Sequence, residues 1–116
     1  MDRKLNKYLS DILSSILEIE SFMETRPREY ATFCNDTLFR RGVERNMEIM
    51  GEAMNQVLKI NPNIPITAAR KIVDTRNFII HAYDSLKPDI LWGIVINHMP
   101  LLKQEVEALL ELDHEE

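Results

Sequence analysis

The sequence of 116 residues predicts an all-α protein that folds as an antiparallel, up-and-down bundle of four main helices. Apolar residues recur at steps of three and four through most of the chain, which is the period of a helix with one buried face. No stretch of four to eight residues shows the alternation and β-branched enrichment typical of a strand. Proline-containing segments at positions 26–27, 61–65 and 84–88 divide the helical pattern into four parts.

The first helix is predicted from Asp2 to about Glu24, where the proline at position 27 prevents its continuation. Its polar face, with Lys7 and Asp11, is expected to face solvent. A short mixed segment at residues 28–34 is expected to form one or two helical turns. The apolar stripe of the first helix consists of Leu5, Leu9, Ile12, Leu13, Ile16, Leu17, Ile19 and Met23.

Asn35 or Asp36 is suited to cap the second main helix, which continues to the turn at residues 61–65. Gly51 lies inside this helix, where a glycine costs about 1 kcal/mol relative to alanine. A close crossing with another helix would justify it. The apolar stripe consists of Leu38, Val43, Met47, Met50, Met54, Val57 and Leu58, and its methionines are expected to be adaptable core residues.

An acidic row follows the same helix. Glu44, Glu48 and Glu52 are spaced by four residues, so that like charges repel each other along one side. A cationic partner would relieve this repulsion, and Arg76 in the next main helix and Arg45 are the two candidates.

The third main helix is predicted to open at Pro65 or Ile66 and to run to about His81. Arg76 falls in the middle of its apolar stripe. A guanidinium does not lose its proton and is costly to bury unpaired, so Arg76 either meets an acid inside the fold or points into a cleft or a subunit interface. The apolar stripe consists of Ala69, Ile72, Val73, Ile79, Ile80 and Tyr83, and a polar stripe of Arg70, Asp74, Asn77 and His81 runs beside it.

The last helix is predicted to begin near Pro88. Pro100 falls within its apolar pattern and is expected to kink or split the helix near His98. His98 is expected to be a packed, hydrogen-bonded residue, and Trp92 to anchor the core or an interface. The apolar stripe consists of Ile90, Leu91, Ile94, Val95, Leu101, Leu102, Val106 and Leu109.

Length and composition indicate one soluble globular domain over residues 1–116, with 45% hydrophobic and 28% charged residues. Cys34 is the one cysteine, which excludes an internal disulfide and fits a reducing cytoplasm. The sequence has no apolar segment of signal-peptide type and no run long enough to cross a membrane. It also lacks a glycine-rich phosphate loop and a zinc ligand cluster, so we expect neither a metal nor a cofactor.

The net charge of −5 argues mildly against a general nucleic-acid binder. The charges are unevenly distributed, because acids crowd the C-terminus while several basic residues lie in the middle of the chain. A basic cleft on an acidic body and a set of solvated helix faces both remain possible. The central basic residues are Arg40, Arg41, Arg45, Arg70, Lys71 and Arg76.

Arg76, His81 and Tyr83 lie within about two helical turns. A histidine can act as general acid or base near neutral pH, and an arginine can hold a phosphate by two points and stabilise charge that develops on it. A tyrosine can donate to a phosphate, stack on a base or be modified. This set suits metal-independent cleavage of a phosphodiester, with the 2′-hydroxyl of RNA as nucleophile.

Two structural alternatives stay open for these residues. His81 can be a capping or surface residue, and Arg76 can belong to an internal ion pair. The two residues are also about 140° apart around a regular helix. They would act together only at the edges of a groove, or if the helix ended or bent near His81.

The segment Arg76-Asn77-x3-His81-x-Tyr83 resembles the R-x4-H-x-Y motif of HEPN-domain proteins, and specifically of the HepT-like toxins of prokaryotic toxin–antitoxin pairs. The resemblance covers nearly the whole chain. One departure is Ile66, where many relatives carry an aromatic residue, and we interpret it as a variation in packing. The other matching segments are residues 44–53, Ile64-Pro65, Leu91-Trp92 and Met99-Pro100-Leu101.

The resemblance implies a HEPN-like bundle that forms a homodimer, in which two motifs meet across the interface to make one RNA-cleaving cleft. Arg76 and His81 would be the catalytic residues of a metal-independent endoribonuclease. Asn77 would orient the phosphate or the histidine, and Tyr83 would contact the substrate.

The resemblance further implies the toxin of a type VII HEPN/MNT toxin–antitoxin system. Its partner would be an MNT-type nucleotidyltransferase antitoxin that transfers AMP to Tyr83 and so neutralises the toxin. The alternative is a non-catalytic helical protein that binds nucleotide or substrate for a nucleotidyltransferase, as HEPN relatives without the motif do. The motif argues against this alternative, and the acidic net charge argues slightly for it.

Overall fold

The computed structural model describes residues 2–81 and 87–115, and the side chains of all of these except His81 and residues 113–115. Within these ranges the chain forms helices and no strand, which confirms the all-α prediction. None of the described helices is long and apolar enough to cross a membrane. The helices are α1 (Arg3–Glu24), α2 (Tyr30–Asn35), α3 (Thr37–Ile60), α4 (Ala69–His81), α5 (Pro88–Asn97) and α6 (Met99–Glu115).

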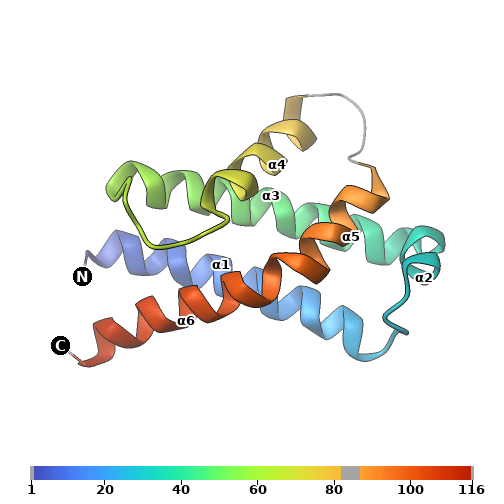
Figure 1. Cartoon of the computed structure of the whole chain (residues 1–116), viewed down its shortest axis with the longest axis horizontal. Coiled ribbons are helices and arrows are strands. Elements are labelled where there is room, and N and C mark those ends of the chain that lie inside the picture. Colours follow the sequence, from blue (N-terminus) through green and yellow to red (C-terminus); the bar gives the residue numbers. More distant parts are fainter. Residues whose placement is uncertain (1, 82–86, 116) are drawn as a thin grey trace.

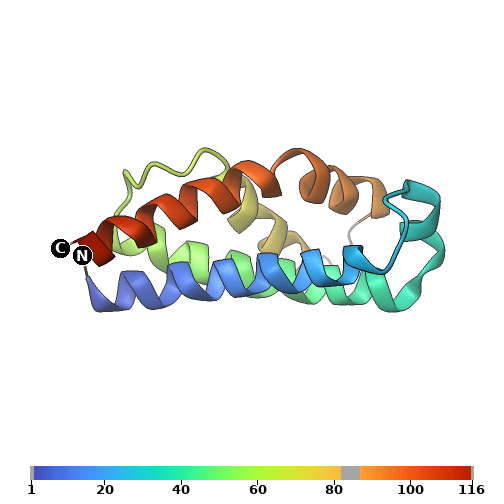
Figure 2. The same ribbon diagram turned by 90° about the horizontal axis from the view of Figure 1, so that it is seen from below.

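The helices form an up-and-down bundle with alternating directions. The long helices α1 and α3 lie side by side, α6 lies along α1, and α4 crosses α3 (Figures 1 and 2). The short helix α2 covers the far end, where it packs on α3 and α5. The start of α1 and the end of α6 lie at the same end of the bundle. The four-helix prediction is confirmed, with α5 and α6 together serving as the fourth helix.

The fourth helix is split at His98, as Pro100 predicts. The His98 N–H donates to the carbonyl of Ile94 at 3.0 Å and closes α5, while the Leu102 N–H donates to the carbonyl of His98 at 3.0 Å. Pro100 has no N–H to continue the ladder between these two bonds. The chain therefore bends at this point and α5 turns toward α2.

Acidic side chains set the starts of two helices. Asp2 accepts from the N–H groups of Lys4 at 2.7 Å and Leu5 at 3.1 Å, so it caps α1 and the helix itself begins one residue later than predicted. Asp36 accepts from the Phe39 N–H at 3.0 Å and caps α3, which is one of the two caps predicted.

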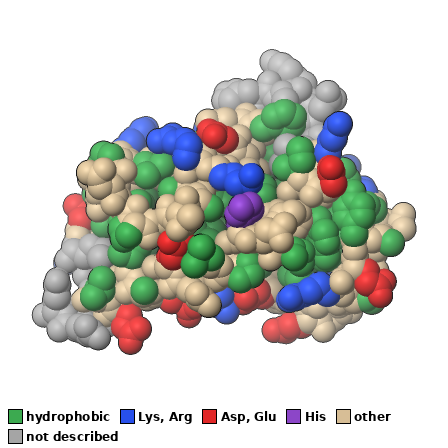
Figure 3. Space-filling model, in the orientation of Figure 1, with side chains coloured by type: hydrophobic (Ala, Val, Ile, Leu, Met, Phe, Trp, Pro, Cys, Tyr) green, Lys and Arg blue, Asp and Glu red, His purple; other side chains and the backbone are tan. Residues whose placement is uncertain are grey.

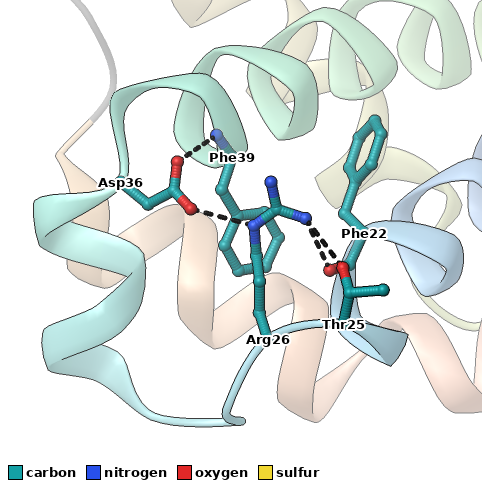
Figure 4. A network of polar contacts seen from close by, with 5 residues as sticks. All are labelled: Phe22, Thr25, Arg26, Asp36 and Phe39. Atoms are coloured by element: carbon teal, nitrogen blue, oxygen red, sulfur yellow. Dashed lines mark hydrogen bonds and ion pairs between the residues drawn. The ribbon is translucent and has the colours of Figure 1, made fainter.

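Arg26 joins the end of α1 to the start of α3 (Figure 4). Its Nε donates to Asp36 at 2.8 Å, its Nη1 donates to the Phe22 carbonyl at 2.9 Å, and its guanidinium lies 5.2 Å from the centre of the Phe39 ring. The Arg26 bond, together with the Phe39 N–H, holds the pKa of Asp36 below its usual value. The connection between α1 and α3 is thus fixed by polar contacts as well as by packing.

One continuous core fills the bundle. Met47, Met50 and Met54 of α3 are fully buried in it, as predicted for adaptable core residues. At the α2 end Phe33 packs on Phe39 and on Trp92, with ring centres 5.1 Å apart in both pairs. Trp92 is half-buried in this cluster and anchors α5 to the core, which is one of the two roles predicted for it.

The predicted apolar stripes are wider than the buried faces. Leu38 is 76% exposed, and Leu17, Ile90 and Leu101 are also exposed, so their prediction as core residues is wrong. Each lies at the margin of its stripe, where the described part of the chain places no helix over it. Periodicity shows which side of a helix is apolar, but only the packing partners decide how much of that side is covered.

The helix α4 begins at Ala69, and not at Pro65 or Ile66 as predicted. The Ile66 N–H donates to the Ile64 carbonyl at 2.8 Å, and the Thr67 N–H and hydroxyl donate to the carboxylate of Glu105 in α6. This carboxylate, 38 residues away in the sequence, holds the preceding segment outside the helix. Ile66 itself is buried, in agreement with a variation in packing.

α4 crosses α3 closely at Gly51. A Cβ atom placed on Gly51 would overlap the Cβ of Arg76 and would lie 2.9 Å from its Cγ and 3.0 Å from the Ile72 carbonyl oxygen. A residue with a side chain cannot occupy this position unless α4 moves. The predicted crossing is confirmed, and it brings α4 onto α3 at Arg76.

We predict that Gly51→Ala lowers the free energy of unfolding by about 2 kcal/mol, because overpacking against fixed backbone outweighs the gain in helix propensity. Urea denaturation followed by circular dichroism would measure this change.

The matched control is Gly93→Ala in α5, where the one described atom within 4 Å of an added Cβ would be the side-chain nitrogen of Asn97, at 4.0 Å. This variant should gain up to about 1 kcal/mol of stability, since only helix propensity changes. A Gly51→Ala protein as stable as the Gly93→Ala protein would contradict the crossing.

Candidate active site

The structure brings two of the four predicted site residues together in the last turns of α4. Arg76 and Asn77 are half-buried neighbours, and Arg76 Nη1 donates to Asn77 Oδ1 at 2.7 Å. His81 is the last residue of α4, and its side chain lies outside the described part of the structure. Tyr83 lies outside the described residues altogether. α4 is described as far as His81 and residues 82–86 lie outside the described part of the chain, so a helix end or bend near His81 stays a prediction.

Arg76 meets an acid on α3. Its Nη2 lies 2.6 Å from Oε2 of Glu52, in an ion pair whose side chains are 23% and 50% exposed. The Nε of Arg76 is buried and has no hydrogen-bond partner among the described residues. Both alternatives raised by the sequence hold, because Arg76 is paired with an acid and also lines a groove.

This groove lies between α1, α3 and α4 and has a volume of about 370 Å³. We call it the Arg76 groove. Its charged side chains form three ion pairs: Lys7 with Asp11 at 2.9 Å, Arg45 with Glu48 at 3.0 Å, and Arg76 with Glu52. The groove is lined by Lys7, Tyr8, Asp11, Arg45, Glu48, Ile49, Glu52, Ala53, Arg76 and Ile80.

Each basic residue in the Arg76 groove is matched by an acid, so the groove is not the strongly basic cleft that the distribution of charge left possible. The hydrogen bond from Lys7 to Asp11 raises the pKa of Lys7. On the acidic row of α3, Glu48 pairs with Arg45 and Glu52 pairs with Arg76, so both candidate cations are partners of the row. Glu44, one turn earlier, is partly buried, and this burial raises its pKa.

The edge of the groove is apolar. Ile80 lines it and is 45% exposed, and Ile49 is also exposed on the α3 side. Phe78 is also 48% exposed, but it lies about 200° around α4 from Ile80 and therefore on another side of the helix. Exposed apolar side chains next to paired charges are typical of a surface that is covered when a partner or a ligand binds.

Other candidate residues lie elsewhere. Lys71, Asn97 and His98 line a second groove of about 240 Å³ between α4 and α5, and Figure 3 shows a histidine beside a basic side chain on this face. Lys71 and Arg76 are five residues apart, about 140° around α4, so the helix separates the two grooves. His98 is therefore not a neighbour of Arg76.

Sequence reasoning missed the contribution of α1. Lys7, Tyr8 and Asp11 line the Arg76 groove, although the sequence predicted only a solvent-facing polar surface there. The only signal was an aromatic residue beside a charged pair on that surface. Among the described residues, no three His, Cys, Asp or Glu side chains lie close enough together to hold a metal ion.

The arrangement offers a fixed guanidinium in a groove at the end of a helix that carries a histidine. A guanidinium can bind the non-bridging oxygens of a phosphodiester, and an imidazole can transfer protons at the bridging oxygens.

Comparison with known proteins agrees with this chemistry. A family model described as Ribonuclease HepT-like matches residues 12–109. The relative named Putative RNase MJ1380, from Methanocaldococcus jannaschii, is 35% identical over 92% of this chain and 97% of its own. The relative named Probable ribonuclease HepT, from Thermococcus cleftensis, is 34% identical over 94% of this chain and 98% of its own. No solved structure matches the chain.

Proposed function

The chain belongs to the HepT-like ribonuclease family, and we propose that it is a metal-independent RNA endonuclease with Arg76 and His81 as its catalytic residues. The observation that carries this proposal is the placement of Arg76. A charged residue on an apolar stripe is held in a groove, five residues before His81 on the same helix.

In the proposed reaction the 2′-hydroxyl of RNA attacks the adjacent phosphorus, and the bond to the 5′-oxygen of the next nucleotide breaks. A His81 imidazole takes the proton from the 2′-hydroxyl, and an imidazolium gives a proton to the departing 5′-oxygen. Arg76 stabilises the negative charge on the non-bridging oxygens, while Asn77 orients its guanidinium. The products are a 2′,3′-cyclic phosphate and a free 5′-hydroxyl.

We propose that the active unit is a homodimer in which two copies of the motif form one cleft. Two histidines would then be present, one to accept a proton and one to donate it. The exposed Ile80 supports this proposal, since it lines the groove in the last described turn of α4 and a dimer formed through the groove would cover it. A small domain also gains buried surface by association.

We further propose that the protein is the toxin of a type VII pair in the cytoplasm, neutralised by an MNT-type nucleotidyltransferase. AMP on Tyr83 would place bulk and a phosphate two residues beyond His81. The charge on Arg76 would favour such a phosphate, and the adduct would keep RNA out of the cleft.

Cleavage of total cellular RNA in the presence of EDTA tests the catalytic assignment. Wild type should cut, and Arg76→Ala and His81→Ala should each lose at least about 100-fold of the rate, because each removes a group that acts in the transition state. Light scattering and denaturation would show that the variants remain folded dimers.

His98→Ala is the matched control, since His98 lines the other groove, and it should cut like wild type. Cleavage by folded Arg76→Ala or His81→Ala at the wild-type rate would refute the assignment. No cleavage by a folded, dimeric wild type free of AMP would favour the non-catalytic binding protein instead.

Incubation with a cognate transferase and ATP tests the modification. Peptides that contain Tyr83 should gain the mass of one AMP, and cleavage activity should fall with the modified fraction. Tyr83→Phe should gain no mass, whereas Tyr8→Phe, which changes a tyrosine of the Arg76 groove, should be modified like wild type. An unchanged mass of the Tyr83 peptides would exclude this mechanism of neutralisation.

A further inference from the structure

The ion pair between Arg76 and Glu52 assigns a role to a residue outside the motif. We infer that Glu52 is a positioning residue: it holds the Arg76 guanidinium in the groove of the free protein and competes with an RNA phosphate for it. This inference rests on the proposed function, because it concerns how the same site takes up its substrate.

Gly51 and Glu52, which are adjacent on α3, both contact the side chain of Arg76. Gly51 leaves room for the Cβ and Cγ of Arg76, and Glu52 binds its Nη2 at 2.6 Å. The first part of the side chain is therefore fixed by the helix crossing. The guanidinium at the end of the side chain is held by Glu52 at Nη2 and by Asn77 at Nη1.

The geometry of a guanidinium explains why Glu52 must compete. A two-point contact with a phosphate uses two adjacent nitrogens, either Nε with Nη2 or Nη1 with Nη2. Nη2 belongs to both of these edges, and it is the atom that Glu52 holds. Nη1 is engaged by Asn77, and Nε is buried. A phosphate that accepts two hydrogen bonds from Arg76 therefore lies next to the Glu52 carboxylate.

Two negative charges around one guanidinium repel each other. Binding of RNA must shift the Glu52 carboxylate or share Nη2 with it, and this lowers the affinity for RNA. In return, the free protein keeps Arg76 ordered in the groove, which lowers the cost of positioning it during the reaction.

Glu52→Gln separates the two effects, because it keeps the length and an acceptor oxygen but removes the charge. We expect this variant to bind RNA about threefold more tightly, with kcat within about twofold of wild type. Glu52→Ala removes the anchor as well, and its kcat should fall about tenfold. Binding would be measured with a short 2′-O-methyl RNA, which cannot be cleaved by attack of the 2′-oxygen.

Glu48→Gln is the matched control. It removes one negative charge from the same groove, one turn earlier on α3, where Glu48 pairs with Arg45 and not with Arg76. Its affinity for RNA should stay within about 1.5-fold of wild type, as expected for an exposed pair that the phosphate does not displace. If Glu48→Gln tightened RNA binding as much as Glu52→Gln, the loss of one negative charge from the groove would explain the effect without release of Arg76. That result would overturn the inference.

A second measurement does not depend on cleavage. The rate at which phenylglyoxal modifies Arg76, measured by peptide mass, should rise in Glu52→Gln, while Arg45 in the same sample should react as in wild type. If wild type failed to cut RNA, the proposed function would fail, and this rate and the binding assay would still test the ion pair. Equal reactivity of Arg76 in wild type and Glu52→Gln, or weaker RNA binding by Glu52→Gln, would overturn the inference.

Discussion

The contact between Gly51 and Arg76 is the constraint on which the site depends. Because Gly51 has no Cβ, α4 can lie directly on α3, and the side chain of Arg76 leaves its helix next to Glu52. Buried core residues of both helices pack around this crossing: Met50 and Met54 of α3, and Ile72 and Val73 of α4. Arg76 can lie on an apolar helix face because Glu52 of the neighbouring helix forms an ion pair with its guanidinium at the surface.

The same crossing shapes the charge of the groove. The acidic row of α3 would repel RNA if it stood alone, but Arg45 and Arg76 neutralise two of its members and Lys7 is matched by Asp11. The groove therefore presents paired charges to a ligand rather than a basic surface. A net charge of −5 is compatible with the proposed ribonuclease, because in this proposal one positioned guanidinium, and not the overall field, would contact the phosphate.

Much of this structure follows from sequence periodicity and single-residue chemistry. The glycine inside α3 predicted a close crossing, the arginine on an apolar stripe predicted an acidic partner or a cleft, and Pro100 predicted a kink or split near His98. The rest depends on contacts between distant parts of the chain. Nothing near Thr67 shows that Glu105 holds the start of α4, and nothing in α1 shows that Tyr8 lines the same groove as Arg76. The sequence of a helix shows which of its sides is apolar, but only the fold determines which other helix packs against that side.

A double-mutant cycle between residues 51 and 76 tests this constraint most directly. Gly51→Ala is combined with Arg76→Gly, which removes the Cβ that the new methyl group would overlap. If the crossing is correct, Gly51→Ala will cost at least about 1 kcal/mol less in the Arg76→Gly background than in wild type, as measured by urea denaturation. Free energies that add to within about 0.5 kcal/mol would show that the two residues are not in contact and would contradict the account.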